Sequence, residues 1–189
     1  MEEIKKFKEF SDVVIGECSR ALGSIKAESV LNAIDAILSA EKVFFIGVGR
    51  SMLALQAMAK RFAHLGIDAY CVGQITEPAI TVKDVLIVGS GSGESLIPVT
   101  IAKKADRIGA KIIHVGSNPE SSLKEITDVF LRIPVRTKLA LADEIDSKQP
   151  MTTIFDQTLL LLGDIMALMI IDRKNLNMQQ LWQYHANLE

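Results

Sequence analysis

A turn rich in glycine and serine, Gly89–Ser95, directly follows an apolar run of strand length, Val85–Val88, and precedes a stretch with helical spacing. We name it the serine turn. A strand, a turn of small residues and a helix start form the anion site of open α/β sheets, because the backbone can approach a phosphate and free N–H groups face it. The hydroxyls of Ser90, Ser92 and Ser95 add donors. The turn contains no lysine, which excludes the nucleotide-binding P-loop and favours a small phosphorylated metabolite.

Apolar runs alternate with stretches of helical spacing through most of the chain. Strands are expected at about 42–47, 68–72, 85–88, 111–116 and 128–133. Helices are expected at about 4–22, 29–40, 52–65, 94–109 and 151–173, with a short one after 117–122 and a last piece at 177–184. The alternation between residues 42 and 133 predicts an α/β fold with a parallel sheet. At 189 residues, we expect a single domain, 1–189.

A second small-residue turn, Gly47–Ser51, follows the strand at 42–47. Parallel strands end at the same edge of a sheet, so both turns fall where α/β proteins bind ligands. The turn is not a dinucleotide fingerprint, because the third glycine is missing and no acidic residue ends the next strand, Tyr70–Val72. A tight strand–helix turn without a ligand stays open as the alternative.

The overall charge and apolar pattern restrict the class of partner. The net charge of −2 argues against a general nucleic-acid binder. The opening residues are charged and mixed, and the longest apolar stretch, Thr158–Ile171, contains Gly163 and Asp164 and is judged too short to span a bilayer. The spacing of Cys18 and Cys71 is not typical of a metal site, and two cysteines are too few to indicate a disulfide framework. We expect a soluble, cytoplasmic protein with no nucleic-acid or membrane partner.

Together, the two turns resemble the sugar isomerase (SIS) domain family. Arg61–Gly66, Asn118–Ser122 and the tail His185–Glu189 are similar to the 6-phospho-3-hexuloisomerases within that family, so the resemblance covers essentially the whole chain. It implies a three-layer αβα, flavodoxin-like fold with a five-stranded parallel sheet, extra N-terminal helices and a long C-terminal helix. It also implies a homo-oligomer, commonly a tetramer, with sites near subunit interfaces.

The resemblance further implies an isomerase of carbohydrate metabolism that interconverts D-arabino-hex-3-ulose 6-phosphate and fructose 6-phosphate. Moving the carbonyl along the sugar through an enediolate requires a base and an acid, but no metal or redox cofactor. The phosphate-binding residues that it implies are Ser51, Ser90, Ser92, Ser95, Gly49 and Gly91. Arg50 either adds charge or is a surface residue. An isomerase for another phosphorylated sugar, and a sugar-phosphate sensor without turnover, stay open.

The candidate base is a carboxylate near the start of the long C-terminal helix. The family carries a pattern like Met-Gly-Ser-Leu-Phe-Glu-Gln there, and this chain has Met151–Gln157 with Asp156 in place of the glutamate. Aspartate is one methylene shorter, and a shift of about an ångström can cost on the order of 10²-fold in rate. A role limited to complementing the helix dipole is the alternative.

Three further residues are candidates for proton transfer. The family tends to carry Gly-Glu-x-x-Thr-Pro where this chain has Gly73–Pro78, so Gln74 replaces an acid and Glu77 stands three residues further on. His64 ends a helix whose dipole favours the protonated ring, and a capping or interface role is its alternative. His185 lies in a polar tail that can reach a neighbouring subunit's pocket, or simply fray.

The remaining expectations concern structure. His114 lies inside a strand and is expected to be structural. Residues 134–150 are polar and irregular, largely solvated, and such a loop can cover the pocket. The long C-terminal helix is apolar nearly all round, so we expect it to be buried between the sheet and a partner subunit.

Overall fold

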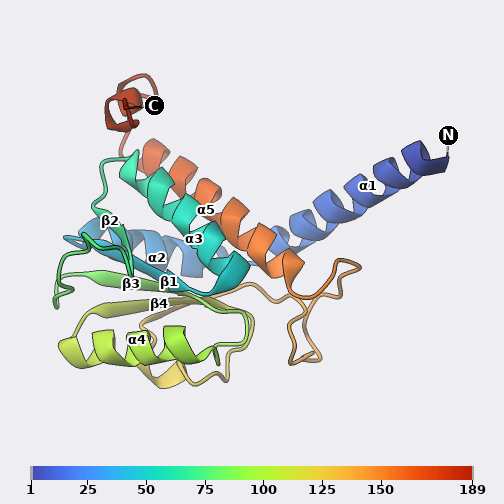
Figure 1. The fold of residues 1–189 in the computed structure, drawn as a ribbon, viewed down its shortest axis with the longest axis horizontal. Helices are drawn as coiled ribbons and strands as arrows, with labels where there is room; N and C mark the ends of the chain where they lie inside the picture. Colours follow the sequence, from blue (N-terminus) through green and yellow to red (C-terminus); the bar gives the residue numbers. More distant parts are fainter. Residues whose placement is uncertain (1, 189) are drawn as a thin grey trace.

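The computed structural model describes residues 2–188, so Met1 and Glu189, the ends of the opening segment and of the tail motif, lie outside it. Its centre is a five-stranded, all-parallel sheet in the order β2-β1-β3-β4-β5 (Figure 1). The strands are β1 (Val43–Gly47), β2 (Ala69–Cys71), β3 (Val85–Gly89), β4 (Lys111–Gly116) and β5 (Val129–Arg132). The predicted α/β class with a five-stranded parallel sheet is confirmed.

Helices cover both faces of the sheet, which gives the three predicted layers (Figure 1). The helices are α1 (Glu2–Gly23), α2 (Ala27–Ser39), α3 (Gly49–Ala63), α4 (Leu96–Ile108) and α5 (Thr153–Arg173), with 3-10 turns η1 (Lys124–Ile126) and η2 (Gln180–Tyr184). One face carries α4 and η1, and the other carries α2, α3 and α5. The short helix expected after residue 122 is a single 3-10 turn.

The central strands are buried on both faces, as parallel strands under helices must be. In β1, Val43 and Phe45 pack into the core beneath α2, α3 and α5, while Phe44 and Ile46 pack against α4. The period of two along the strand therefore divides one apolar run between two cores. The ring of Phe45 meets Phe62 of α3 edge-on at 6.0 Å between centroids, which joins β1 to the helix that follows it.

The long helix α5 packs on the body of the protein along one side only. Its inner side, including Phe155 and Leu159, is buried against α3 and the sheet, but Leu160, Ile165 and Leu168 are partly exposed. The whole helix, Thr153–Arg173, is long and apolar enough to cross a membrane by length and composition alone, and the apolar stretch that was judged too short, Thr158–Ile171, is only part of it. More than half of its most apolar window is buried inside the protein, as in the core helix of a soluble protein.

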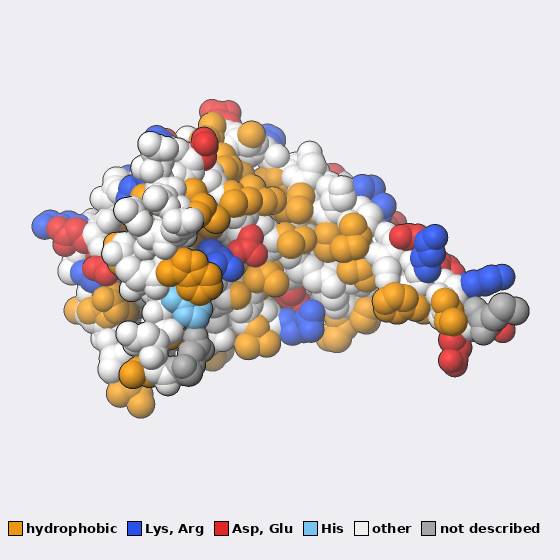
Figure 2. Space-filling model, turned by 90° about the horizontal axis from the view of Figure 1, so that it is seen from above, with side chains coloured by type: hydrophobic (Ala, Val, Ile, Leu, Met, Phe, Trp, Pro, Cys, Tyr) orange, Lys and Arg blue, Asp and Glu red, His pale blue; other side chains and the backbone are white. Residues whose placement is uncertain are grey.

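The helix α1 extends from the body, and its first half has little contact with the rest of the chain (Figure 1). Ile4, Phe7, Phe10 and Ile15 are exposed along it. In Figure 2, hydrophobic side chains gather over the upper face of the molecule and continue along this arm. Apolar surface of this extent is typical of a protein–protein contact.

His114 has the structural role expected of it. It is buried in β4, its Nε2 lies 3.0 Å from the Ser90 carbonyl oxygen, and its ring lies 5.1 Å from that of Phe130. A carbonyl oxygen only accepts, so Nε2 carries the proton. Burial lowers the pKa of His114 from 6.5 to about 4, although the bond to Ser90 acts in the opposite direction. The neutral ring thus fixes the first residue of the serine turn after β3.

We predict that the stability of the protein depends on the His114 ring through pH. The unfolded chain binds this proton more tightly, so the free energy of unfolding falls as pH decreases from 6.5 toward 4. Between pH 7 and pH 5 the loss from this group is about 2 kcal/mol. Urea unfolding at fixed protein concentration, with His114→Gln for comparison, measures it. An equally steep pH dependence in His114→Gln, or an NMR-titrated ring pKa near 6.5, would contradict this assignment.

Candidate active site

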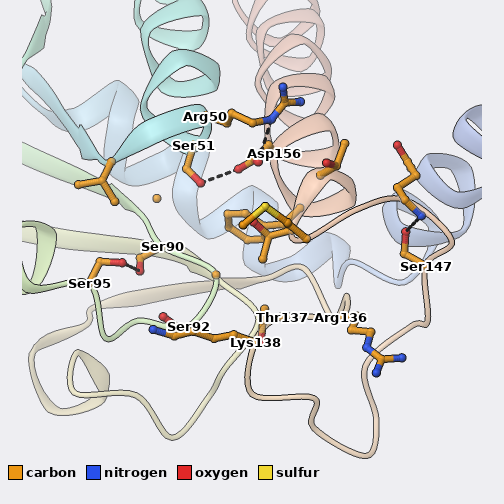
Figure 3. A pocket seen from close by; sticks show the side chains of 18 of the residues that line it. Arg50, Ser51, Ser90, Ser92, Ser95, Arg136, Thr137, Lys138, Ser147 and Asp156 are labelled. Carbon is orange, nitrogen blue, oxygen red and sulfur yellow. Dashed lines mark hydrogen bonds and ion pairs between the residues drawn. The ribbon is translucent and has the colours of Figure 1, made fainter.

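A cavity of about 690 Å³ lies at the carboxyl ends of β1 and β3, where α3 and α4 begin (Figure 3). We call it the serine pocket. The first turns of two helices and the start of α5 meet there, so backbone N–H groups and helix dipoles face one space. The polar residues that line it are Arg50, Ser51, Ser90, Ser92, Ser95, Arg136, Thr137, Lys138, Ser147, Gln149, Thr152, Thr153 and Asp156.

The serine turn is held by its carbonyl groups, which leaves amides for a ligand. The Gly91 carbonyl accepts from Ser117 N at 2.8 Å, and the Ser92 carbonyl accepts from Asn118 Nδ2 at 3.1 Å. Within residues 2–188, the N–H groups of Gly91, Ser92 and Ser95 donate to no protein atom. Amides that point away from the fold at a helix N-terminus form an anion site.

The hydroxyls of the turn are also available. Ser95 is the N-cap of α4 but makes no side-chain capping bond, and its Oγ lies 3.4 Å from Ser90 Oγ. Ser92 Oγ accepts from Glu94 N at 3.3 Å, which leaves its proton free to donate. The predicted residues Ser90, Ser92, Ser95 and Gly91 therefore line one cavity, in which Ser90 Oγ donates to Ser95 Oγ and the protons of Ser92 and Ser95 are free to donate to a ligand.

Asp156 lies on the other side of the serine pocket, in the first turn of α5. Ser51 Oγ donates to its Oδ1 at 2.6 Å, and Arg50 Nε lies 3.4 Å from its Oδ2. The carboxylate is 8% exposed, whereas the Arg50 side chain is 65% exposed. Arg50 is thus a member of the site, and Ser51 is engaged by the carboxylate instead of joining the other serines.

The turn predicted at Gly47–Ser51 is shorter than expected. The helix α3 already begins at Gly49, so Arg50 and Ser51 belong to its first turn. Gly49 itself does not line the cavity, although Val48 and Arg50 on either side of it do. The helical start is what directs Arg50 and Ser51 toward α5.

The irregular segment 134–150, which we name the pocket loop, forms the remaining wall (Figure 3). The sequence predicted that this segment is largely solvated, or alternatively that it covers the pocket. In the structure it forms a wall of the pocket. Thr137, Lys138, Ser147 and Gln149 line the cavity, and none was a candidate from the sequence. The sequence feature that could have indicated them is that these polar residues cluster directly before the helix that carries Asp156.

The other proton-transfer candidates lie elsewhere. His64 and His185 stack with ring centroids 5.3 Å apart in a second cavity, beside Trp182 and the far end of α5. His64 caps the C-terminus of α3 and Ser51 lies at its N-terminus, and 15 helical residues span about 22 Å. Within one chain, His64 and His185 therefore do not reach Asp156.

Glu77 is not part of the serine pocket either. Its Oε2 accepts from Gly73 N at 2.6 Å, and it lines a small cavity beside Phe44 and Ile101. Gln74 Oε1 accepts from Cys71 N at 2.6 Å in the same connection. Both side chains hold the turn after β2, which accounts for their polarity without catalysis.

The expectation that the helix dipole favours protonated His64 was wrong. Burial lowers the pKa of His64, and the nearby charges of Lys60, Arg61 and His185 lower it further. Two cations in the last turn of α3 offset the negative end of the dipole, so the neutral ring is preferred.

A family model described as the SIS domain matches residues 36–161, which span β1 to β5 and the first half of α5. The chain belongs to the SIS domain family. A protein of Bacillus subtilis (strain 168) named 3-hexulose-6-phosphate isomerase is 34% identical over 184 residues, which are 97% of this chain and 100% of that protein. The resemblance drawn from the two turns is therefore confirmed.

Two other proteins are also similar to this chain. A crystal structure of a Methanococcus jannaschii protein, described with an inferred function of 3-hexulose-6-phosphate isomerase, matches with a TM-score of 0.82 and 31% identity over 96% of this chain and 99% of that chain. An uncharacterised HTH-type transcriptional regulator of Clostridium perfringens (strain 13 / Type A) is 26% identical over 127 residues, 65% of this chain and 46% of the regulator.

We predict that a methyl group at Gly93 disrupts the serine turn of this SIS domain. Gly93 has a φ of +67°, and a Cβ there would lie 2.3 Å from the Ser121 Cβ. Gly73 is the matched control, because its φ is +94° and a Cβ meets nothing within 4 Å. Gly73→Ala should cost about 1–2 kcal/mol from backbone strain, and Gly93→Ala roughly 1–3 kcal/mol more from overlap. Urea unfolding of both variants measures the difference, and equal costs would contradict the packing described.

Proposed function

We propose that this SIS domain protein is a sugar-phosphate isomerase that interconverts D-arabino-hex-3-ulose 6-phosphate and fructose 6-phosphate. One observation carries the proposal: a buried carboxylate, Asp156, shares a cavity with the free amides and hydroxyls of the serine turn. The 3-hexulose-6-phosphate isomerase named among the similar proteins, matched over its full length, supports the choice of sugar.

The serine turn would hold the phosphate, with the sugar chain directed across the pocket toward Asp156. Asp156 would take the proton from carbon 3 of fructose 6-phosphate, and the electron pair would form the C2–C3 double bond of an enediolate. Return of the proton to carbon 2, with transfer of the proton on the carbon 3 oxygen to the carbon 2 oxygen, gives the 3-ketose. Arg50, beside the carboxylate, is the group available to stabilise the negative oxygen that develops on carbon 2.

We also propose that a second copy of the chain supplies the group that moves the oxygen-bound protons. His64 and His185 lie at the far end of α3, too distant to serve their own Asp156. The exposed apolar residues of α1 and α5 offer a surface on which copies can associate, in keeping with a homotetramer. In such an assembly, the histidine pair of one chain can lie at the serine pocket of its neighbour.

A sugar-phosphate sensor without turnover is the second candidate, because the regulator among the similar proteins belongs to a different functional class. A sensor requires the serine turn but no placed carboxylate. Turnover that depends on Asp156 therefore separates the two functions.

We predict that Asp156→Asn lowers kcat for fructose 6-phosphate by about 10³-fold or more while binding stays within a few-fold, because a base is lost and the phosphate site is not touched. Ser90→Ala should weaken binding about tenfold through loss of one donor. The assay follows formation of the 3-ketose without added metal. Asp172→Asn is the control, with the same change on an exposed part of α5. Full activity in Asp156→Asn would refute the role of this carboxylate.

We predict that Asp156→Asn and His64→Ala complement each other when the two chains are assembled together. If each site combines Asp156 of one chain with His64 of its neighbour, random mixing restores about a quarter of the sites. Each variant alone should be inactive. The measurement compares mixed and unmixed preparations after size analysis shows mixed oligomers. Mixed oligomers without recovered activity would contradict a shared site.

A further inference from the structure

The serine turn contains no cation, yet a sugar phosphate is close to doubly charged at neutral pH. Among the described residues that line the serine pocket, three side chains are cationic. Arg50 faces Asp156 at 3.4 Å, and Arg136 Nη1 pairs with Asp146 Oδ1 at 2.7 Å. Within residues 2–188, the third, Lys138, makes no hydrogen bond or ion pair. The pocket therefore contains one cation that the fold does not use.

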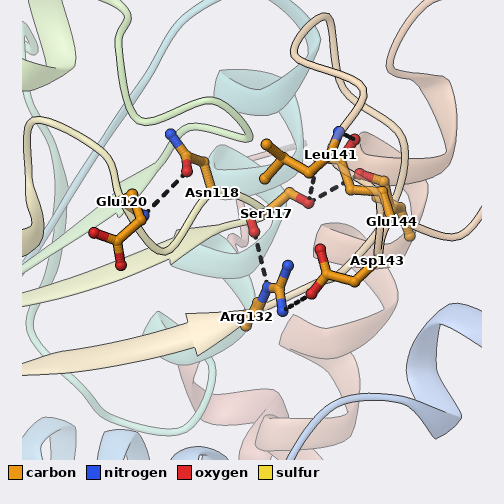
Figure 4. Close-up of polar contacts among 8 residues, drawn as sticks. Ser117, Asn118, Glu120, Arg132, Leu141, Asp143 and Glu144 are labelled. Carbon is orange, nitrogen blue, oxygen red and sulfur yellow. Dashed lines mark hydrogen bonds and ion pairs between the residues drawn. The ribbon is translucent and has the colours of Figure 1, made fainter.

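A single carboxylate, Glu144, fixes the backbone on both sides of Lys138, and Figure 4 shows Glu144 beside Ser117 and Leu141. Glu144 accepts from Thr137 N at 3.1 Å, from Thr137 Oγ1 at 2.9 Å and from Leu141 N at 3.0 Å. Leu139 N in turn donates to Thr137 Oγ1 at 3.2 Å. Three bonds to Glu144 and one to Thr137 close the loop into a tight turn that contains Lys138.

The same carboxylate ties this turn to the serine turn. Ser117 Oγ donates to Glu144 Oε1 at 2.9 Å, and Ser117 N donates to the Gly91 carbonyl at 2.8 Å. Thr137 packs directly on the serine turn, because a Cβ at Gly91 would lie 3.3 Å from its Cγ2. Lys138 is thus anchored one residue away from a contact with the anion site.

A second buried carboxylate holds the other end of the pocket loop. Glu17 of α1 accepts from Ser147 Oγ at 2.5 Å, from Lys148 N at 2.8 Å and from Gln149 Nε2 at 3.1 Å. Burial raises the pKa of Glu17, but these bonds outweigh it and leave that pKa below its ordinary value. Both ends of the loop are therefore fixed against the body of the protein.

The acidic side chain that interacts with Lys138 is bonded to another residue, so the Lys138 ammonium group is available to a ligand. The acid that interacts with the charge of Lys138 is Glu94, whose pKa is lowered first by hydrogen bonds from Ser122 and less by the charges of Lys103 and Lys138. The Glu94 carboxylate already accepts hydrogen bonds from Ser122 N at 2.7 Å and from Ser122 Oγ at 2.6 Å. In Figure 3, the Lys138 side chain extends along the pocket wall toward Ser92.

We propose that Lys138 is the cation that pairs with the substrate phosphate at the serine turn, and that Glu144 is the positioning residue that holds it there. The proposal rests on the proposed function only in taking a phosphorylated sugar as the ligand. A lysine ammonium is a compact charge on a flexible stem, suited to approach a phosphate that neutral donors already orient.

Direct binding of fructose 6-phosphate and of inorganic phosphate, measured by calorimetry beside the kinetic assay, tests this. Lys138→Met keeps the stem and should weaken both ligands and raise KM by about 10- to 100-fold, with kcat nearly unchanged. Lys138→Arg should restore most of the affinity. Lys103→Met is the matched control, because Lys103 also acts on Glu94 but does not line the pocket. Equal effects in Lys138→Met and Lys103→Met would overturn the proposal.

Glu144→Gln tests the positioning role through a double-mutant cycle. It should raise KM in the wild-type background but add little in the Lys138→Met background, whereas a merely structural role would give the same effect in both. Binding that depends on Lys138 in a protein without turnover would refute the proposed reaction and support this site. Turnover with Lys138-independent binding would refute this site alone.

Discussion

In the sheet, Gly47 at the end of β1 lies directly opposite Gly89 at the end of β3. Both strands stop at the same level, so α3 and α4 begin at the same edge of the sheet, on opposite faces of it, and residues at both helix starts line one cavity. The contact of α5 with α3 then brings Asp156 to Ser51. The serine pocket thus depends on the parallel register of two strands, and the later segments add a carboxylate and a wall to a space that this register creates.

The parts of the site that the sequence predicted are those with a local signal. The serine turn joins a strand to a helix within a few residues, and Asp156 stands in a pattern at the start of one helix. The sequence indicated that the pocket loop can cover the pocket but not which of its residues line it, because Glu144 and Glu17 act on it through bonds between segments up to 132 residues apart. Sequence also places residues on elements without giving distances, so it did not indicate that His64 and His185 stack on each other at the end of α3 far from the Asp156 of their own chain.

The proposed base and the histidines lie at opposite ends of α3, so a complete site would require two chains in contact. The exposed apolar surfaces of α1 and α5 would provide that contact. Leu160, Ile165 and Leu168 of α5 are partly exposed, and α1 carries a row of exposed apolar side chains away from the body. Burial of that surface against another copy would both stabilise the assembly and complete the acid–base set. In the same way, Glu17 couples α1 to the pocket loop, so the helix that extends from the body also supports the wall of the site.

The central claim is that this pocket removes the proton from carbon 3 of a 2-ketose phosphate. Proton NMR of fructose 6-phosphate incubated with the protein in deuterium oxide tests it most directly, because each carbon-bound hydrogen gives its own signal. The account predicts that the signal of the hydrogen on carbon 3 is lost by exchange while both hydrogens on carbon 1 remain. Exchange at carbon 1, as an aldose–ketose isomerase would give, or retention of every signal without any 3-ketose formed, would contradict it.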